Sequence, residues 1–194
     1  MSRPARAGGS PLTRALAKAF IEAIGEEASL EGARAFIDRA VADAEPDEPP
    51  GLTPAELAEN LADFWRFAGK RAGAGPMVRL VAGLGEHAGG LMRLEIVQDD
   101  APFLVDSVMG EIAEQGVSVR AMYHPVAPMA RDRNGRRTAT GRPRAESLIQ
   151  VMIDALPPHR EAALLEGVRA TLSDVRASVD DFQAMAALMG AAIA

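Results

Sequence analysis

The sequence of 194 residues contains no cysteine, three histidines and few aromatic residues: one tryptophan, one tyrosine and six phenylalanines. Without cysteine the chain has no disulfide bonds, no thiolate nucleophile and no zinc site built on sulfur, and this composition fits a reducing cytosol. The histidines are scattered, at His87, His124 and His159. We therefore expect no metal site and no catalytic residues in this chain.

Several functional signatures are also missing. The chain has no apolar run that would form a signal peptide or a membrane span, so we expect a cytoplasmic protein without a membrane partner. It has no nucleophile elbow and no H-E-x-x-H motif. The glycine-rich segment 83–90 is not a phosphate-binding loop, because no lysine follows it and a strand rather than a helix comes next. The net charge of −6 argues against a dedicated nucleic-acid partner.

The residues that are present have the composition of an ordinary soluble globular protein, with 48% hydrophobic and 25% charged residues. We expect a disordered tail over residues 1–9 and a helical subdomain of three antiparallel helices over residues 10–72. Ser10 precedes a proline at the first position of the first helix. Thr53 and Glu56 have the spacing of a capping box at the start of the third helix.

The second half of the chain alternates between the periods of strands and helices. A short β-like run at Met77–Val81 and a glycine-rich hairpin connection precede a strand over Met92–Val97. A helical stripe at Leu104–Ile112 ends at Gly116, which is placed for a left-handed cap. The remaining elements are a strand at residues 117–121, a central strand at Ser147–Asp154 and a helix from Pro157.

This order predicts an α+β domain over residues 76–180. Counted from the strand at Met92, the order is βαββα, and Asp174–Val179 is either a last edge strand or the end of the preceding helix. With that strand, a βαββαβ chain builds a ferredoxin-like antiparallel sheet with both helices on one face. The other face needs a cover, either the helical subdomain or a second copy of the module. We expect a separate amphipathic helix over residues 181–194.

The turn between the first strand and the first helix of this domain is the candidate ligand site. Asp100 or Ala101 is placed to cap the helix, with Pro102 near its first turn. Free backbone N–H groups would then lie beside two carboxylates, which suits a small ligand, although capping and the helix dipole alone also explain the two acids. The candidate residues are Gln98, Asp99, Asp100, Ala101, Pro102 and Phe103, together with His124 at a strand end.

An arginine-rich loop around the turn signal Asn134-Gly135 is a second candidate site. One hypothesis is a stand-alone anion- or RNA-binding domain that uses this loop. Against it, the loop lacks the aromatic residues on which single-stranded nucleic acids stack, so a solvated loop or one docked on an acidic neighbour is the alternative. The candidate residues are Arg131, Arg133, Arg136 and Arg137.

Four short motifs occur in the same order as in one known family. They are DDAPFLVDSV from Asp99, HPV from His124, RDRNG from Arg131 and ESLI from Glu146. In these motifs the chain resembles the N-terminal region of the large, NAD-specific glutamate dehydrogenases of bacteria. The resemblance covers roughly residues 77–181, and the helical N-terminus fits the family more loosely.

The resemblance implies a fold, an activity and partners. The region is similar to the first of several ACT-type modules, which have the order βαββαβ and precede the catalytic domain. The whole enzyme converts glutamate to 2-oxoglutarate and ammonia, usually as a homo-oligomer. The resemblance therefore implies NAD in the parent enzyme and no cofactor in this region. Residues 181–194 would join this region to the catalytic domain. The resemblance also implies an amino-acid effector. Amino-acid-binding ACT modules carry a glycine where this chain has Phe103, which favours packing between domains or subunits.

Overall fold

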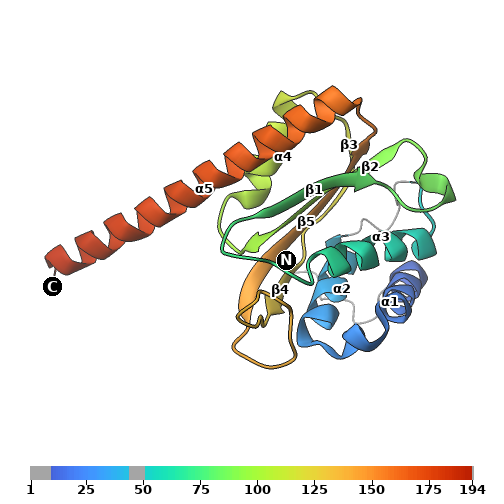
Figure 1. The fold of residues 1–194 in the computed structure, drawn as a ribbon, viewed down its shortest axis with the longest axis horizontal. Coiled ribbons are helices and arrows are strands. Elements are labelled where there is room, and N and C mark those ends of the chain that lie inside the picture. The colour runs from blue at the N-terminus through green and yellow to red at the C-terminus, as the bar shows by residue number, and fades with distance from the viewer. Residues whose placement is uncertain (1–9, 44–50, 194) are drawn as a thin grey trace, which may run out of the picture.

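The computed structural model describes residues 10–43 and 51–193, and the tail predicted for residues 1–9 lies outside the described residues. The elements are α1 (Pro11–Ile24), the 3-10 helix η1 (Gly25–Ser29), α2 (Glu31–Asp43), α3 (Pro54–Phe67), β1 (Met77–Ala82), the 3-10 helix η2 (Glu86–Ala88), β2 (Leu91–Asp99), α4 (Leu104–Glu114), β3 (Val119–Tyr123), β4 (Val126–Met129), β5 (Arg144–Asp154) and α5 (Pro158–Ile193). The sheet lies between helices α1–α3 on one side and α4 and α5 on the other (Figure 1).

Helices α1 and α3 begin where the capping residues predict. The Ser10 hydroxyl accepts a hydrogen bond from the Thr13 N–H at the start of α1. Both bonds of the predicted capping box are present at the start of α3, between Thr53 and Glu56. The helices then pack through a cluster of four fully buried aromatic side chains: Phe20, Phe36, Phe64 and Trp65.

The sheet is antiparallel throughout and has the strand order β1-β2-β5-β3, with β4 also paired to β5. Helix α4 connects β2 to β3, and β5 lies between these two strands, antiparallel to both. This is the split β-α-β unit of a ferredoxin-like fold, as the sequence predicts. Strand β2 pairs with β5 over its whole length, from Leu91 opposite Asp154 to Asp99 opposite Glu146.

The structure differs from the prediction after β5. Residues Asp174–Val179, for which the periodicity left strand and helix open, lie within α5. The edge beside β2, which the last strand of a βαββαβ unit occupies, is taken by β1 through the predicted hairpin. The prediction of a separate helix over residues 181–194 is wrong, because α5 is one helix up to Ile193. No proline interrupts it after Pro158, and aspartates at 180 and 181 lower helix propensity too little to end it.

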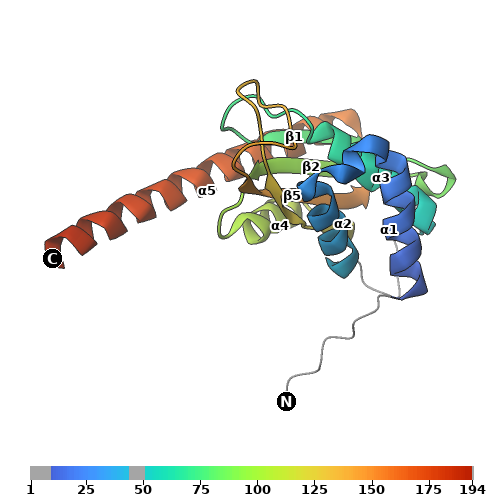
Figure 2. The same ribbon diagram turned by 90° about the horizontal axis from the view of Figure 1, so that it is seen from below.

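Helices cover both faces of the sheet (Figure 2). On one face Leu94, Ile96 and Ile149 form a core with Val108 of α4 and Leu164 of α5. On the other face the buried residues of α1–α3 form a second core with six sheet residues: Val97, Tyr123, Ala127, Met129, Leu148 and Met152. The helical region is therefore the cover that the second face needs. No helix in the described ranges is long and apolar enough to cross a membrane.

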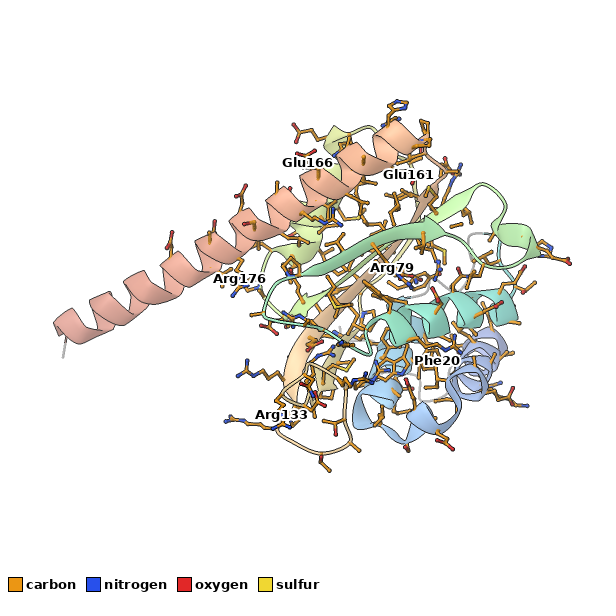
Figure 3. The ribbon with its side chains drawn as sticks, viewed as in Figure 1. Phe20, Arg79, Arg133, Glu161, Glu166 and Arg176 are labelled. Atoms are coloured by element: carbon orange, nitrogen blue, oxygen red, sulfur yellow. The ribbon has the colours of Figure 1, made fainter. Side chains whose placement is uncertain are left out.

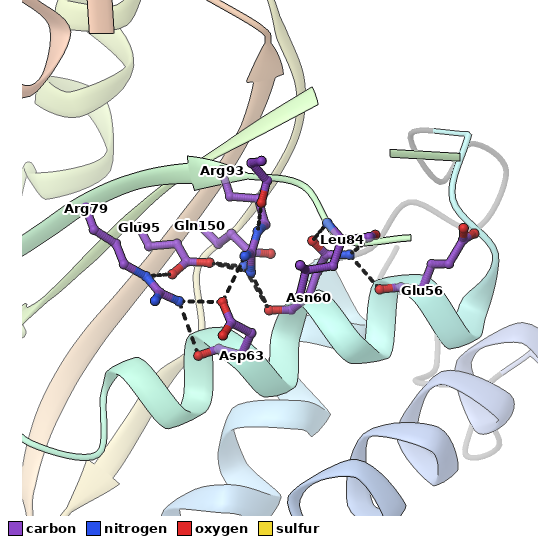
Figure 4. A network of polar contacts seen from close by, with 9 residues as sticks. Glu56, Asn60, Asp63, Arg79, Leu84, Arg93, Glu95 and Gln150 are labelled. Atoms are coloured by element: carbon purple, nitrogen blue, oxygen red, sulfur yellow. Dashed lines mark hydrogen bonds and ion pairs between the residues drawn. The ribbon is translucent and has the colours of Figure 1, made fainter. Parts of the chain in front are cut away.

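A buried network of polar side chains joins α3 to the sheet (Figure 4). The Glu95 carboxylate on β2 is fully buried and accepts hydrogen bonds from three donors: Arg79 at 2.6 Å, Arg93 at 2.9 Å and Gln150 at 2.9 Å. Arg93, which is 2% exposed, also donates to Asp63 of α3 at 2.8 Å. Burial raises the pKa of Glu95, and the two arginines offset this effect only in part. Charge pairs therefore help to fix α3 against the sheet.

Candidate functional site

The turn between β2 and α4 differs from its prediction. The sequence suggests Asp100 or Ala101 as the helix cap, but α4 begins at Leu104, directly after Phe103. Phe103 has left-handed backbone angles, φ 67° and ψ 2°, and no side chain caps the helix. The Asp100 carboxylate instead accepts a hydrogen bond from Ser147 on β5. The cap prediction is wrong because Phe103 leaves the helical region of backbone angles, which delays the start of the helix.

Phe103 is unusual in both its backbone and its side chain. It is the one non-glycine residue with a positive φ in the part of the chain that the structure describes. This conformation costs an L-residue about 1–2 kcal/mol. Phe103 is also 70% exposed, and no other large hydrophobic side chain among residues 10–42 and 51–179 is exposed. The position therefore has a backbone conformation that favours glycine but carries a large apolar side chain.

A chain of hydrogen bonds joins the turn to His124. Ser147 is fully buried, and its hydroxyl donates to Asp100 Oδ1 at 2.6 Å. His124 Nε2 lies 3.0 Å from the same hydroxyl oxygen. Because that hydroxyl gives its one hydrogen to Asp100, His124 Nε2 is the donor in the second bond. No group of three or more histidine, aspartate or glutamate side chains among residues 10–43 and 51–193 is arranged to hold a metal ion.

Asp99, the last residue of β2, contacts a cluster of ion pairs behind the turn. The Arg71 side chain is 3% exposed, and its guanidinium lies 2.6 Å from the Asp99 carboxylate and 3.5 Å from Glu146. Glu146 also accepts two hydrogen bonds from the Arg131 guanidinium, at 2.6 and 2.7 Å. Arg71 lies beyond the end of α3, and its role carries no signal in the sequence. The cluster ties the turn to β5 and to the segment that follows α3.

A cavity of about 200 Å³ opens beside the turn. Four of the six predicted turn residues line it: Gln98, Asp99, Asp100 and Ala101. Its other walls come from the start of α4, the segment before β1 and the middle of α5: Leu104, Ala74, Pro76, Val175, Arg176 and Val179. Pro102 and Phe103 line a separate, larger groove on the side of α5. The turn therefore lies between two hollows that differ in volume and in the residues that line them.

The arginine-rich loop divides into internal and exposed residues. Arg137 stacks on Trp65, with its guanidinium carbon 3.5 Å from the ring centre, and donates to the Trp65 carbonyl oxygen at 2.9 Å. Arg131 is held by the Glu146 cluster. Internal contacts therefore occupy the guanidinium groups of Arg131 and Arg137. Arg133 and Arg136 are exposed, and Figure 3 places Arg133 at the outer edge of the loop.

The matches to known proteins agree with this arrangement. Residues 36–168 match the family described as glutamate dehydrogenase, ACT1 domain, so the match runs from within α2 into α5. The sequence is also 38% identical over 111 residues to the NAD-specific glutamate dehydrogenase of Halomonas elongata, a match that covers 52% of this chain and 7% of that relative. The chain thus spans only a small part of the relative's length. No solved structure matches the chain. On the family match over most of its residues, the chain belongs to the glutamate dehydrogenase ACT1 domain family.

Proposed function

We propose that the chain is a non-catalytic regulatory and assembly module of an NAD-dependent glutamate dehydrogenase. The whole enzyme would convert glutamate to 2-oxoglutarate and ammonia, with NAD bound in a downstream catalytic domain and no cofactor bound by this module. The family membership and the name of the Halomonas relative support this proposal. The observation that carries it is the β2–α4 turn, where a cavity, two carboxylates and a helix N-terminus meet on a split β-α-β fold.

We further propose that an amino-acid effector binds in the cavity at this turn. A free amino acid carries an ammonium and a carboxylate group at neutral pH, so its site needs groups of both signs. Asp100 offers a carboxylate to the ammonium group, and the N-terminus of α4 attracts an anion through its dipole and backbone N–H groups. Phe103 lies on the wall of the neighbouring groove, so its side chain does not fill this cavity.

Isothermal titration of the chain with a panel of amino acids tests the sensing part. We expect saturable heat for at least one amino acid, which Asp100→Asn abolishes. Asp106→Asn is the matched control, because Asp106 has the same charge, is exposed in the first turn of α4 and does not line the cavity. An absence of heat and of any thermal shift at millimolar ligand would refute sensing and leave assembly as the role of the module.

The regulatory part is tested in the whole enzyme. The amino acid found by titration should change the rate of NAD-dependent glutamate oxidation, and Asp100→Asn in the same enzyme should remove this change while the basal rate stays the same. An effector response that persists unchanged in Asp100→Asn would place the regulatory site elsewhere in the enzyme.

A further inference from the structure

The side chain of Gln98 belongs to the wall of the cavity beside the β2–α4 turn. Residues two positions apart in a strand share a face of the sheet, and Leu94 and Ile96 of β2 lie in the core formed with α4 and α5. Gln98 continues this series. Its amide therefore lies on the side of the sheet where the cavity opens, together with Leu104 of α4 and Val175 of α5.

The amide of Gln98 is buried but lacks a hydrogen-bond partner. The residue is 8% exposed, yet no group among residues 10–43 and 51–193 forms a hydrogen bond with its side chain. The two acidic residues that follow it do have partners, because Asp99 pairs with Arg71 and Asp100 accepts from Ser147. An unpaired buried amide is unfavourable, and in the wall of a cavity it is explained if a ligand pairs with it.

The acidic residues behind the wall already have basic partners. The Asp99 carboxylate lies 2.6 Å from the Arg71 guanidinium. Glu146 lies 3.5 Å from Arg71 and accepts a hydrogen bond from Arg131 at 2.6 Å. Two carboxylates and two guanidinium groups therefore balance one another, and none of them requires a charged ligand.

Among the described residues, two further charged side chains line the cavity, and they have opposite signs. Asp100 lies at the turn, and Arg176 extends from α5 and donates to the Ala74 carbonyl oxygen at 3.0 Å (Figure 3). An amino acid with an uncharged side chain adds one charge of each sign and keeps this balance. A charged side chain would enter the cavity without a counter-charge, which is unfavourable. The charges therefore favour an effector whose side chain is uncharged.

We propose that Gln98 determines the specificity of the effector site and selects an amino acid with a primary amide side chain, glutamine or asparagine. This inference rests on the proposed amino-acid site at the turn and adds the chemical class of the side chain. Gln98 and such a ligand each present an NH2 donor and a carbonyl acceptor, so the two amides can pair through two hydrogen bonds. A carboxylate side chain only accepts, and an apolar one leaves both groups of Gln98 unpaired.

Isothermal titration of the chain with four amino acids tests the selection: glutamine, asparagine, glutamate and methionine. We expect the better of the two amides to bind at least tenfold more tightly than glutamate or methionine. Gln98→Met should weaken binding of that amide at least tenfold and leave the affinity for methionine undiminished. Gln115→Met is the matched control, because Gln115 lies at the end of α4 and does not line the cavity, so the order of affinities should stay the same.

The outcomes separate this inference from the proposed function on which it rests. Binding of several amino acids without preference for an amide, or the same preference in Gln98→Met, would overturn the role of Gln98 and leave the effector site in place. An absence of heat for every amino acid would overturn both.

Thermal unfolding without ligand tests whether the amide has a structural role instead. Gln98→Met replaces an unpaired amide by an apolar side chain of similar length, so we expect an equal or higher midpoint of unfolding. A midpoint lowered by several degrees would show that the amide stabilises the fold and would overturn the proposal.

Discussion

Replacement of Phe103 by glycine is the most direct test of the strain at the turn. Phe103 is held at φ 67°, where the side chain of an L-residue costs about 1–2 kcal/mol and glycine is unstrained. Against this gain, glycine has more freedom in the unfolded chain, which costs about 0.5–1 kcal/mol. Because Phe103 is 70% exposed, its replacement gives up little buried area. We expect Phe103→Gly to leave the free energy of unfolding of the monomer unchanged or to raise it by about 1 kcal/mol.

Alanine at the same position separates strain from side-chain packing. Phe103→Ala removes the ring but keeps Cβ, so the unfavourable backbone remains and the glycine variant should be more stable than the alanine variant by about 1 kcal/mol. Urea denaturation at a dilution where each sample is monomeric measures the difference. An alanine variant as stable as the glycine variant would refute the argument, because it would show that the turn does not impose a left-handed conformation.

Three further outcomes follow from the buried charges. Glu95→Ala should lower the free energy of unfolding by about 3–5 kcal/mol, because the buried Arg93 loses an ion partner, and Glu95→Gln should lower it less in the same denaturation assay. Arg137→Lys should cost about 1–2 kcal/mol through loss of stacking on Trp65, visible as a lower midpoint of thermal unfolding, while Arg133→Lys should change nothing. Partial burial raises the pKa of Asp63. Hydrogen bonding from Arg93 and the charges of the two nearby guanidinium groups lower the pKa by more than burial raises it, so the net shift is downward. The stabilisation is therefore present above the unfolded pKa and is lost as pH falls through the folded value, and Asp63→Asn should flatten the loss of stability below about pH 4.

Much of the fold follows from local signals in the sequence. The caps at Ser10 and Thr53 and the presence of strand β2 are indicated by residues adjacent in the sequence, and the structure has each of them, although β2 is buried on both faces. The segment that occupies the edge of the sheet beside β2 was not predictable from such local signals. Whether Asp174–Val179 is a strand depends on which segment occupies the edge beside β2, and β1 occupies it through an antiparallel hairpin. With the edge filled, the apolar spacing of α5 continues as helix without competition.

The residues of the candidate site likewise divide into those that the local sequence predicts and those whose roles depend on distant residues. Gln98 to Ala101 could be predicted, because a strand that ends before a helix places such residues at one rim of a sheet. Ser147 and Arg71 could not, because their roles depend on partners distant in sequence. Ser147 reaches the turn only because β5 pairs with β2 in the register that sets it opposite Gln98. A serine in an apolar strand is a weak signal until that register is known.

The arginines of the loop illustrate why charge alone misleads. Arg131 donates a hydrogen bond to the Ala68 carbonyl oxygen, and Arg137 donates one to the Trp65 carbonyl oxygen. Both acceptors lie at the C-terminal end of α3, where positive charge is favourable. Arg131 also holds Glu146, which shares Arg71 with Asp99 at the rim of the cavity. A ligand that draws the Asp99 carboxylate away leaves a buried guanidinium with one acidic partner fewer. If an effector binds at the turn as proposed, its binding would therefore be linked energetically to the packing of the segment that follows α3.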